Sequence, residues 1–162
     1  MTPNFPEVET RMAEVALQQL KRKSIVAEYE RRSANEKPEF MMACAAYVLW
    51  LIMVGSSQTQ KASKVNSIVG AIHAGFRTCD WYRAGLFESI WESIQDSMPT
   101  MRAGPQTGIL IPLVHVIEAA NRAGCHLDHT TELDVMIESS LMLNELPQIA
   151  AAAKPKRWHL WK

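Results

Sequence analysis

The pattern of hydrophobic and polar positions is most distinctive between Phe40 and Val54, where fifteen consecutive residues carry neither a charge nor a strongly polar group. A surface helix has one apolar and one polar face, and this stretch has no polar face to offer water. Pro38 suits the first turn of a helix and Gly55 suits its end. The pattern therefore predicts a helix over residues 38–55 that is buried on all sides.

A membrane-spanning helix is the alternative for this stretch. At about 1.5 Å per residue, fifteen residues cover roughly 22 Å, which is less than the roughly 30 Å hydrocarbon core of a bilayer. Tyr47 and Trp50 lie mid-stretch, whereas spanning helices carry such rings near the two interfaces. Lys37 and Lys61, on either side, give no charge asymmetry that would set an orientation. We expect the core helix of a soluble domain, and a membrane anchor over residues 40–54 is the less favoured reading.

Elsewhere the apolar residues recur at spacings of three and four, which is typical of amphipathic helices. Further helices are expected over residues 7–35, 61–76, 80–98, 112–124 and 131–147. Small residues along one flank of the helix at 61–76 would let another helix approach closely. The sequence predicts an all-α, single-domain bundle of about six helices over residues 1–147, arranged around the central apolar helix and followed by a tail over residues 148–162.

Charge and cysteine content give little direct indication of function. The 162 residues contain 17 basic and 17 acidic side chains, so no global field would gather nucleic acid or anionic lipid. Cys44, Cys79 and Cys125 are odd in number and far apart, which gives no disulfide framework. The N-terminal residues lack the basic and apolar segments of a secretory signal. We expect a reducing, cytoplasmic compartment.

Residues 61–97 read as a helix, a short turn and a second helix, which invites comparison with helix-turn-helix DNA-binding proteins. The second helix would have to face phosphates, yet it carries Glu88, Glu92 and Asp96 against the single Arg83. An acidic helix is repelled by the DNA backbone. The segment is therefore predicted to be a packed helical hairpin.

Metal and catalytic sites find weak support. Cys125, His126, Asp128 and His129 lie within five residues, but their spacing matches no strong zinc pattern, and whether they bind a metal stays open. No nucleophile elbow or glycine-rich phosphate loop is present, and His73 is expected to be a partly buried packing residue. We predict a non-enzymatic protein with no catalytic residues, cofactor, metal or small-molecule substrate.

Protein binding is the leading functional hypothesis. The second half of the predicted helix 7–35 mixes charges of both signs with a thin apolar seam, a pattern that suits pairing with another chain, although a solvated face has the same appearance. The candidate partner-binding residues are Arg22, Ile25, Val26, Tyr29, Arg32, Trp158 and Trp161. We expect an adaptor, a small inhibitor or an assembly subunit that binds a protein partner or a second copy of itself.

The basic and aromatic tail supports a second hypothesis. Its cations and indole rings are Lys154, Lys156, Arg157, Trp158, Trp161 and Lys162. This mixture suits phosphate contacts combined with base stacking, and it predicts a nucleic-acid-binding accessory factor. The alternative for the tail is that its tryptophans pack onto the domain while its cations remain solvated.

Overall fold

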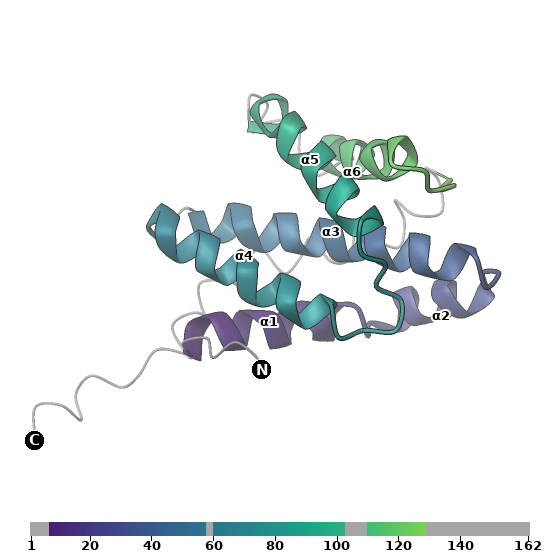
Figure 1. The fold of residues 1–162 in the computed structure, drawn as a ribbon, viewed down its shortest axis with the longest axis horizontal. Coiled ribbons are helices and arrows are strands. Elements are labelled where there is room, and N and C mark those ends of the chain that lie inside the picture. Colours follow the sequence, from purple (N-terminus) through teal and green to yellow (C-terminus); the bar gives the residue numbers. More distant parts are fainter. Residues whose placement is uncertain (1–6, 58–59, 103–109, 129–162) are drawn as a thin grey trace, which may run out of the picture.

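The computed structural model describes residues 7–57, 60–102 and 110–128, and this part of the chain contains helices and no strand (Figure 1). The helices are α1 (Glu7–Gln19), α2 (Lys23–Arg31), α3 (Glu36–Ser57), α4 (Ala62–Phe76), α5 (Leu86–Arg102) and α6 (Leu110–Arg122). The predicted all-α bundle is confirmed.

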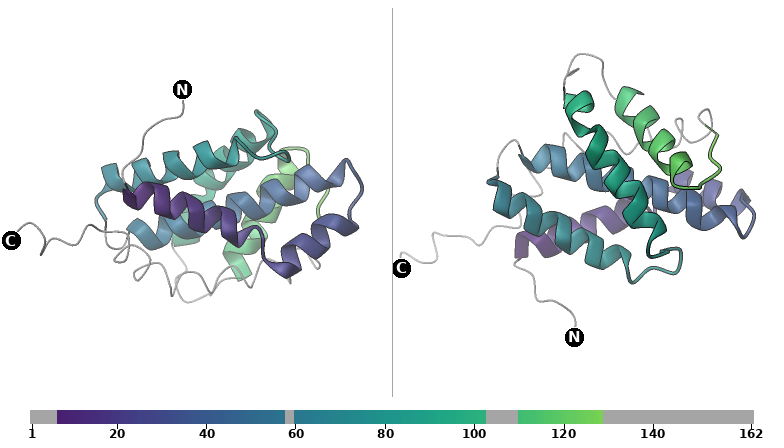
Figure 2. Two further views of the ribbon diagram at one scale, coloured as in Figure 1. Left: turned by 90° about the horizontal axis from the view of Figure 1, so that it is seen from below. Right: turned by 45° about the horizontal axis from the view of Figure 1, so that its top comes forward.

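Helix α3 is the centre of the bundle, as the sequence predicts. It packs against all five other described helices, and every residue from Phe40 to Ile52 is buried. In Figures 1 and 2, α1 and α4 lie on one side of α3 while α5 and α6 lie on the other. The stretch without a polar face is therefore enclosed by the other helices.

The length of α3 corrects one step of the sequence analysis. Its 22 residues extend about 33 Å, so the expectation that this helix is too short to cross a bilayer is wrong. By length and composition it could span a membrane, and it is the one described helix of which this is true. Of its most apolar 18-residue stretch, 78% is buried inside the protein.

Helices α1 and α4 run parallel and form the most extensive helix–helix contact in the described chain. Near their N-terminal ends, Lys64 forms an ion pair with the fully buried carboxylate of Glu9. Near their C-terminal ends, a Cβ atom on Gly75 would lie 3.6 Å from Leu17 and 3.9 Å from Ala13. The small residue Gly75 of α4 therefore packs against α1, at distances that are ordinary van der Waals contacts.

The predicted single helix over residues 7–35 is wrong, because the chain breaks after Gln19 and starts α2 at Lys23. Two turn hydrogen bonds mark the break, from the Lys21 N–H to the Gln18 carbonyl at 3.0 Å and from the Arg22 N–H to the Gln19 carbonyl at 3.3 Å. No glycine or proline occupies this position. The break lets α2 fold back onto α3, so tertiary packing overrides the helical propensity of these residues.

Two other boundaries also differ from expectation. Helix α5 begins at Leu86, not directly after Asp80, and it continues through Pro99 to Arg102. Residues 77–85 form a connection longer than the short turn of a helix-turn-helix motif. The predicted helix over 131–147 and the boundary at 147–148 lie outside the described residues, so the six helices found are not the same six that the sequence predicts.

Candidate functional site

The junction between α4 and α5 rests on a cluster of aromatic rings. Phe76 at the end of α4 and Phe87 at the start of α5 are both fully buried, and their ring centroids lie 5.8 Å apart. Trp81 of the connection lies 5.7 Å from Phe76, measured between ring centroids. These ring contacts fix the path of the connection. They also bring polar side chains from α4, the connection and α5 close together.

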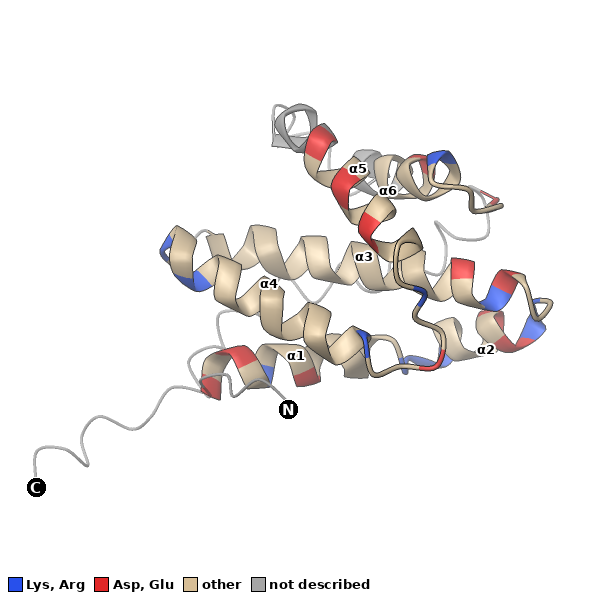
Figure 3. Cartoon of the chain, viewed as in Figure 1, with Lys and Arg blue, Asp and Glu red and all other residues tan. Residues whose placement is uncertain are grey.

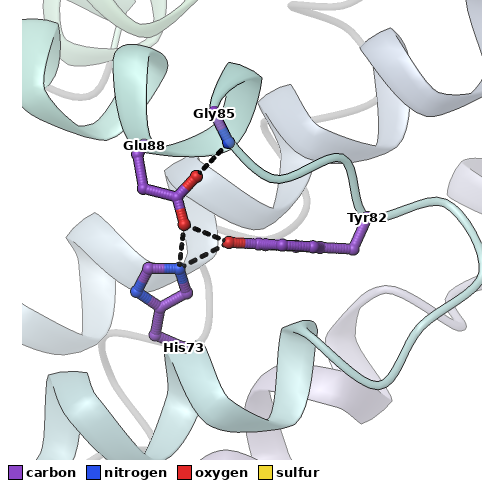
Figure 4. Close-up of polar contacts among 4 residues, drawn as sticks. All are labelled: His73, Tyr82, Gly85 and Glu88. Carbon is purple, nitrogen blue, oxygen red and sulfur yellow. Dashed lines mark hydrogen bonds and ion pairs between the residues drawn. The ribbon is translucent and has the colours of Figure 1, made fainter.

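Three polar side chains from three segments meet at this junction (Figure 4). The Nε2 atom of His73, on α4, lies 2.9 Å from the hydroxyl oxygen of Tyr82 in the connection. The Tyr82 hydroxyl donates a hydrogen bond to Oε1 of Glu88 on α5, and the same oxygen lies 3.4 Å from His73 Nε2. We call His73, Tyr82 and Glu88 the junction cluster.

Glu88 also explains where α5 begins. The backbone N–H of Gly85 donates to Glu88 Oε2 at 2.6 Å, and Glu88 is the third residue of α5. A glutamate at this position that binds back to the residue before the helix is half of a capping box. Gly85 has a φ of 83°, which glycine adopts readily because it has no Cβ atom.

The electrostatic environment favours a neutral histidine beside an ionised glutamate. Burial and the charge of Arg77 lower the pKa of His73, and they outweigh the attraction of Glu88. The hydrogen bond from Tyr82 lowers the pKa of Glu88. Burial, followed by the hydrogen bond to Glu88, raises the pKa of Tyr82. Around neutral pH the phenol therefore keeps its proton and the carboxylate stays charged.

This pattern assigns the tautomer of His73. A tyrosine hydroxyl has one proton, and Tyr82 donates it to Glu88. The hydroxyl oxygen then accepts from His73, so the neutral imidazole carries its proton on Nε2, an assignment that follows from the hydrogen bonds. The cluster can tie α4, the connection and α5 together, and it can bind or release a proton at His73.

A second polar contact follows α6, where the chain leaves the α5–α6 pair. After α6, the backbone N–H of His126 donates to Oε2 of Glu39, in the first turn of α3, at 3.0 Å. The side chain of Asn121 holds the same segment, since it accepts from the Leu127 N–H at 2.9 Å and donates to the Leu127 carbonyl at 3.2 Å. The segment after α6 is thus fixed to the start of α3.

The candidate metal ligands lie in this segment. Burial raises the pKa of the Cys125 thiol to about 12, so at neutral pH it is protonated, whereas metals bind the thiolate. The Nδ1 atom of the exposed His126 lies 3.5 Å from Glu39 Oε1. Within residues 7–57, 60–102 and 110–128, no group of three or more His, Cys, Asp or Glu side chains is arranged to hold a metal ion. His129 lies outside these ranges.

Acidic residues recur along α5 (Figure 3). Glu88, Glu92 and Asp96 are four residues apart and therefore share one side of the helix. Glu92 and Asp96 are exposed. The residues buried by α5, among them Ile90 and Ile94, lie on the other side. We call Glu88, Glu92 and Asp96 the acidic face of α5.

Most of the predicted partner-binding residues in and next to α2 do not lie on an open surface. Ile25 is fully buried, which corrects its expected place on a surface. Tyr29 packs against the core. Arg32 pairs with Glu28 at 3.0 Å. The reason is the break at residues 20–22, which turns this side of α2 toward α3.

Two residues of the predicted seam remain outside the core. Val26 is 37% exposed, the one exposed large hydrophobic residue among those described. Arg22 is partly exposed and donates to the Gln19 side chain at 2.6 Å. A single valine does not form a continuous apolar seam, so the surface of α2 is mainly charged.

The tail predictions lie outside the described residues. They concern Lys154, Lys156, Arg157, Trp158, Trp161 and Lys162. Both the protein-binding and the nucleic-acid-binding readings of the tail therefore stay predictions.

Sequence reasoning missed the junction cluster. It placed His73 as a partly buried packing residue, which holds for its exposure, since the side chain is 17% exposed. It did not connect His73 with Tyr82 or Glu88. The available signal was Gly85 followed three residues later by Glu88, the spacing of a capping interaction, which would have placed the start of α5 and hence its neighbours.

Comparison of the chain with protein-family models, with curated proteins and with solved structures finds no significant match to any of them.

Proposed function

We propose that this chain is a helical protein-binding module whose docking surface is the acidic face of α5 and whose partner presents a cationic segment. The observation that carries the proposal is the spacing of three acidic residues, four apart, which puts them on one side of α5. From Leu86 to Asp96 the helix has no lysine or arginine to neutralise them. This differs from α2, where Glu28 is paired with both Arg31 and Arg32.

Repulsion between like charges on α5 is the reason to expect a cationic partner. Like charges four residues apart oppose helix formation by about 0.2–0.5 kcal/mol per pair. A cationic partner would convert this repulsion into attraction and would be steered toward the surface. The same charges repel phosphates, which favours a protein partner over nucleic acid on this face.

The test is affinity capture with the full chain as bait, followed by a binding titration with the purified captured partner. The variant is Glu92→Gln/Asp96→Asn, which removes two exposed carboxylates and leaves Glu88 in the junction cluster. The matched control is Glu14→Gln/Glu30→Gln, which removes two exposed carboxylates from α1 and α2.

We expect the variant to weaken binding by tenfold or more and the control to bind as the wild type does, with affinity falling as salt is raised. A partner that binds all three proteins equally would contradict the assignment of this surface. A partner whose affinity does not change with salt would contradict the cationic chemistry.

A further inference from the structure

Basic residues from two separate chain segments gather at one end of the bundle. Leu17, near the end of α1, packs against Gly75, near the end of α4, since a Cβ atom on Gly75 would lie 3.6 Å from its side chain. The break between α1 and α2 follows the first of these helix ends, and the α4–α5 connection follows the second. The basic patch, as we call it, consists of Lys21, Arg22 and Lys23 at the break and Arg77 and Arg83 in the connection.

The two segments of the basic patch lie close enough to influence each other. Burial raises the pKa of the Cys79 thiol in the connection, and the charge of Lys21 at the break is one of the smaller influences that oppose this shift. Arg83 is held along the connection, because its guanidinium donates to the backbone carbonyl of Asp80 at 2.7 Å. The five cations therefore belong to one region of the surface.

The charges of the basic patch are open to solvent. Its residues are exposed except for Arg22, which is half-buried. Among the residues that the structure describes, no ion pair involves any of the five. Residues 20–23 and 77–85 contain one acidic residue, Asp80, against these five cations, which leaves a surplus of four positive charges. An exposed surplus of this kind attracts an anionic surface.

The acidic face of α5 is an anionic surface on the same molecule. Glu92 and Asp96 lie about 6 and 12 Å farther along the helix than Glu88, and α5 leads away from the connection. A single helix cannot fold back to bring these carboxylates onto the patch of its own chain, so the contact requires a second copy. The 17 basic and 17 acidic residues of the chain balance, and two copies therefore do not repel each other through a net charge.

A second copy also suits the basic patch better than nucleic acid does. The patch borders the acidic face, because Glu88 follows Arg83 by only five residues. A phosphate backbone that crossed the patch would meet these carboxylates and be repelled by them. A second copy presents both signs of charge, as the region around the patch does.

We propose that the basic patch of one copy receives the acidic face of α5 from a second copy, so that the molecules associate head to tail. The inference rests on the proposed function, since it names a second copy of this chain as the cationic partner of that face. Such a contact joins two different surfaces and leaves a free patch on one copy and a free acidic face on the other. Further copies add to these free surfaces, so association leads to a ring or a filament and does not stop at a dimer.

The experiment is sedimentation equilibrium of the full chain over a series of protein concentrations at neutral pH. Exposed ion pairs are individually weak, so we expect the mean mass to rise above that of the monomer at high protein concentration and low salt. The distance over which charges act falls from roughly 30 Å at 0.01 M salt to about 8 Å at 0.15 M. The dissociation constant should therefore increase by about tenfold or more between these two conditions.

Two charge-reversed variants test the two surfaces. Lys21→Glu/Lys23→Glu reverses charges of the basic patch, and Glu92→Lys/Asp96→Lys reverses charges of the acidic face. Each variant alone should associate about tenfold more weakly or less, because like charges then face each other. An equimolar mixture of the two should associate again, because each reversed surface meets a surface of opposite charge on the other variant.

The matched control is Arg11→Glu/Lys61→Glu. It reverses two exposed cations outside the basic patch and changes the net charge by the same amount as Lys21→Glu/Lys23→Glu. The control should therefore keep most of the wild-type association, whereas the patch variant loses it.

A wild type that stays monomeric at low salt would overturn the inference, and if its patch binds single-stranded DNA instead, the patch belongs to nucleic acid. Association that Glu92→Lys/Asp96→Lys abolishes but Lys21→Glu/Lys23→Glu leaves unchanged would also overturn it, while the proposed function of the acidic face would stand. Association that depends on the patch and not on Glu92 and Asp96 would contradict both. A mixture of the two variants that stays monomeric would show that the two surfaces do not meet.

Discussion

The two sides of α3 are built differently. On one side, α1 and α4 form the most extensive helix–helix contact of the described chain, with an ion pair between the buried Glu9 and the partly exposed Lys64 and with Gly75 packed against Leu17. On the other side, α5 and α6 pack mainly against each other. Their connections to the body run through α3, the junction cluster and the Glu39–His126 contact.

Apolar burial and polar contacts have different roles on the two sides of α3. Apolar burial is non-directional and supplies most of the free energy of folding, so the continuous core around α3 determines that the helices gather. Polar contacts are directional, so the contacts at the two junctions add to the packing of Phe76 and Phe87 in placing the α5–α6 pair. We expect the two sides of the molecule to respond differently to the same chemical change.

The largest expected effect comes from truncating one core isoleucine on each side of α3. These two variants test whether the two sides unfold separately. Ile68 in α4 and Ile90 in α5 are both fully buried, and Ile→Ala should lower the free energy of unfolding by about 4 kcal/mol at each site. In hydrogen exchange, Ile68→Ala should expose amides throughout the chain. Ile90→Ala should expose α5 and α6 first. Equal exposure of α1, α4 and α5 by both variants would show that the described helices unfold as one cooperative unit.

Removal of the Glu9–Lys64 ion pair tests the α1–α4 side alone. Lys64→Met should lower the free energy of unfolding by about 3 kcal/mol, because Glu9 is fully buried and would lose its partner. The double variant Glu9→Met/Lys64→Met should recover most of this loss, since no buried charge remains. Chemical denaturation measures both. A double variant that is as unstable as Lys64→Met would show that packing, not the unpaired charge, dominates.

The sequence was sufficient to predict the elements that depend on a local pattern. Phe40 to Val54 offers no polar face, and the structure buries all of it from Phe40 to Ile52. The stripe of Val65, Ile68 and Ile72 is buried on α4 as its spacing predicts. These features follow from helical periodicity and from the need to remove apolar surface from water.

The features that sequence could not predict depend on contacts between segments. The break after Gln19 occurs among residues that favour helices, and burial of Ile25 against the bundle explains it. The junction cluster needs α4, the connection and α5 to be in place before His73 and Glu88 meet. Local propensity carries no information about such contacts.

Alkaline pH should weaken the α5–α6 side through Cys125. Its pKa is raised to about 12, mainly by burial, whereas an exposed thiol titrates near 8.5. The unfolded chain therefore loses this proton first, and stability is intact below about pH 8.5 and falls by up to about 1.4 kcal/mol per pH unit above it. Denaturation at pH 7.5, 9 and 10 measures the slope.

The Cys125→Ala variant sharpens this measurement, because it removes the thiol and should make the alkaline slope shallower. Cys79→Ala is the comparison variant, and it should change the slope less. Burial also raises the pKa of Cys79, but that residue is only partly buried in the α4–α5 connection. An unchanged slope in Cys125→Ala would assign the alkaline loss to other groups, such as the buried Tyr47, whose pKa burial also raises.

The two glycines of α4 give the smallest effect and the finest probe of the α1–α4 contact. A Cβ atom on Gly70 would meet nothing within 4 Å, so Gly70→Ala should stabilise the protein by about 0.8–1 kcal/mol through helix propensity alone. A Cβ atom on Gly75 would meet Leu17 at 3.6 Å, an ordinary van der Waals distance, so Gly75→Ala should be neutral or slightly stabilising. Thermal unfolding of both variants measures the difference. If Gly75→Ala is destabilising by 1 kcal/mol or more, α1 and α4 approach each other more closely than these distances indicate, and the small residue at position 75 is required by packing.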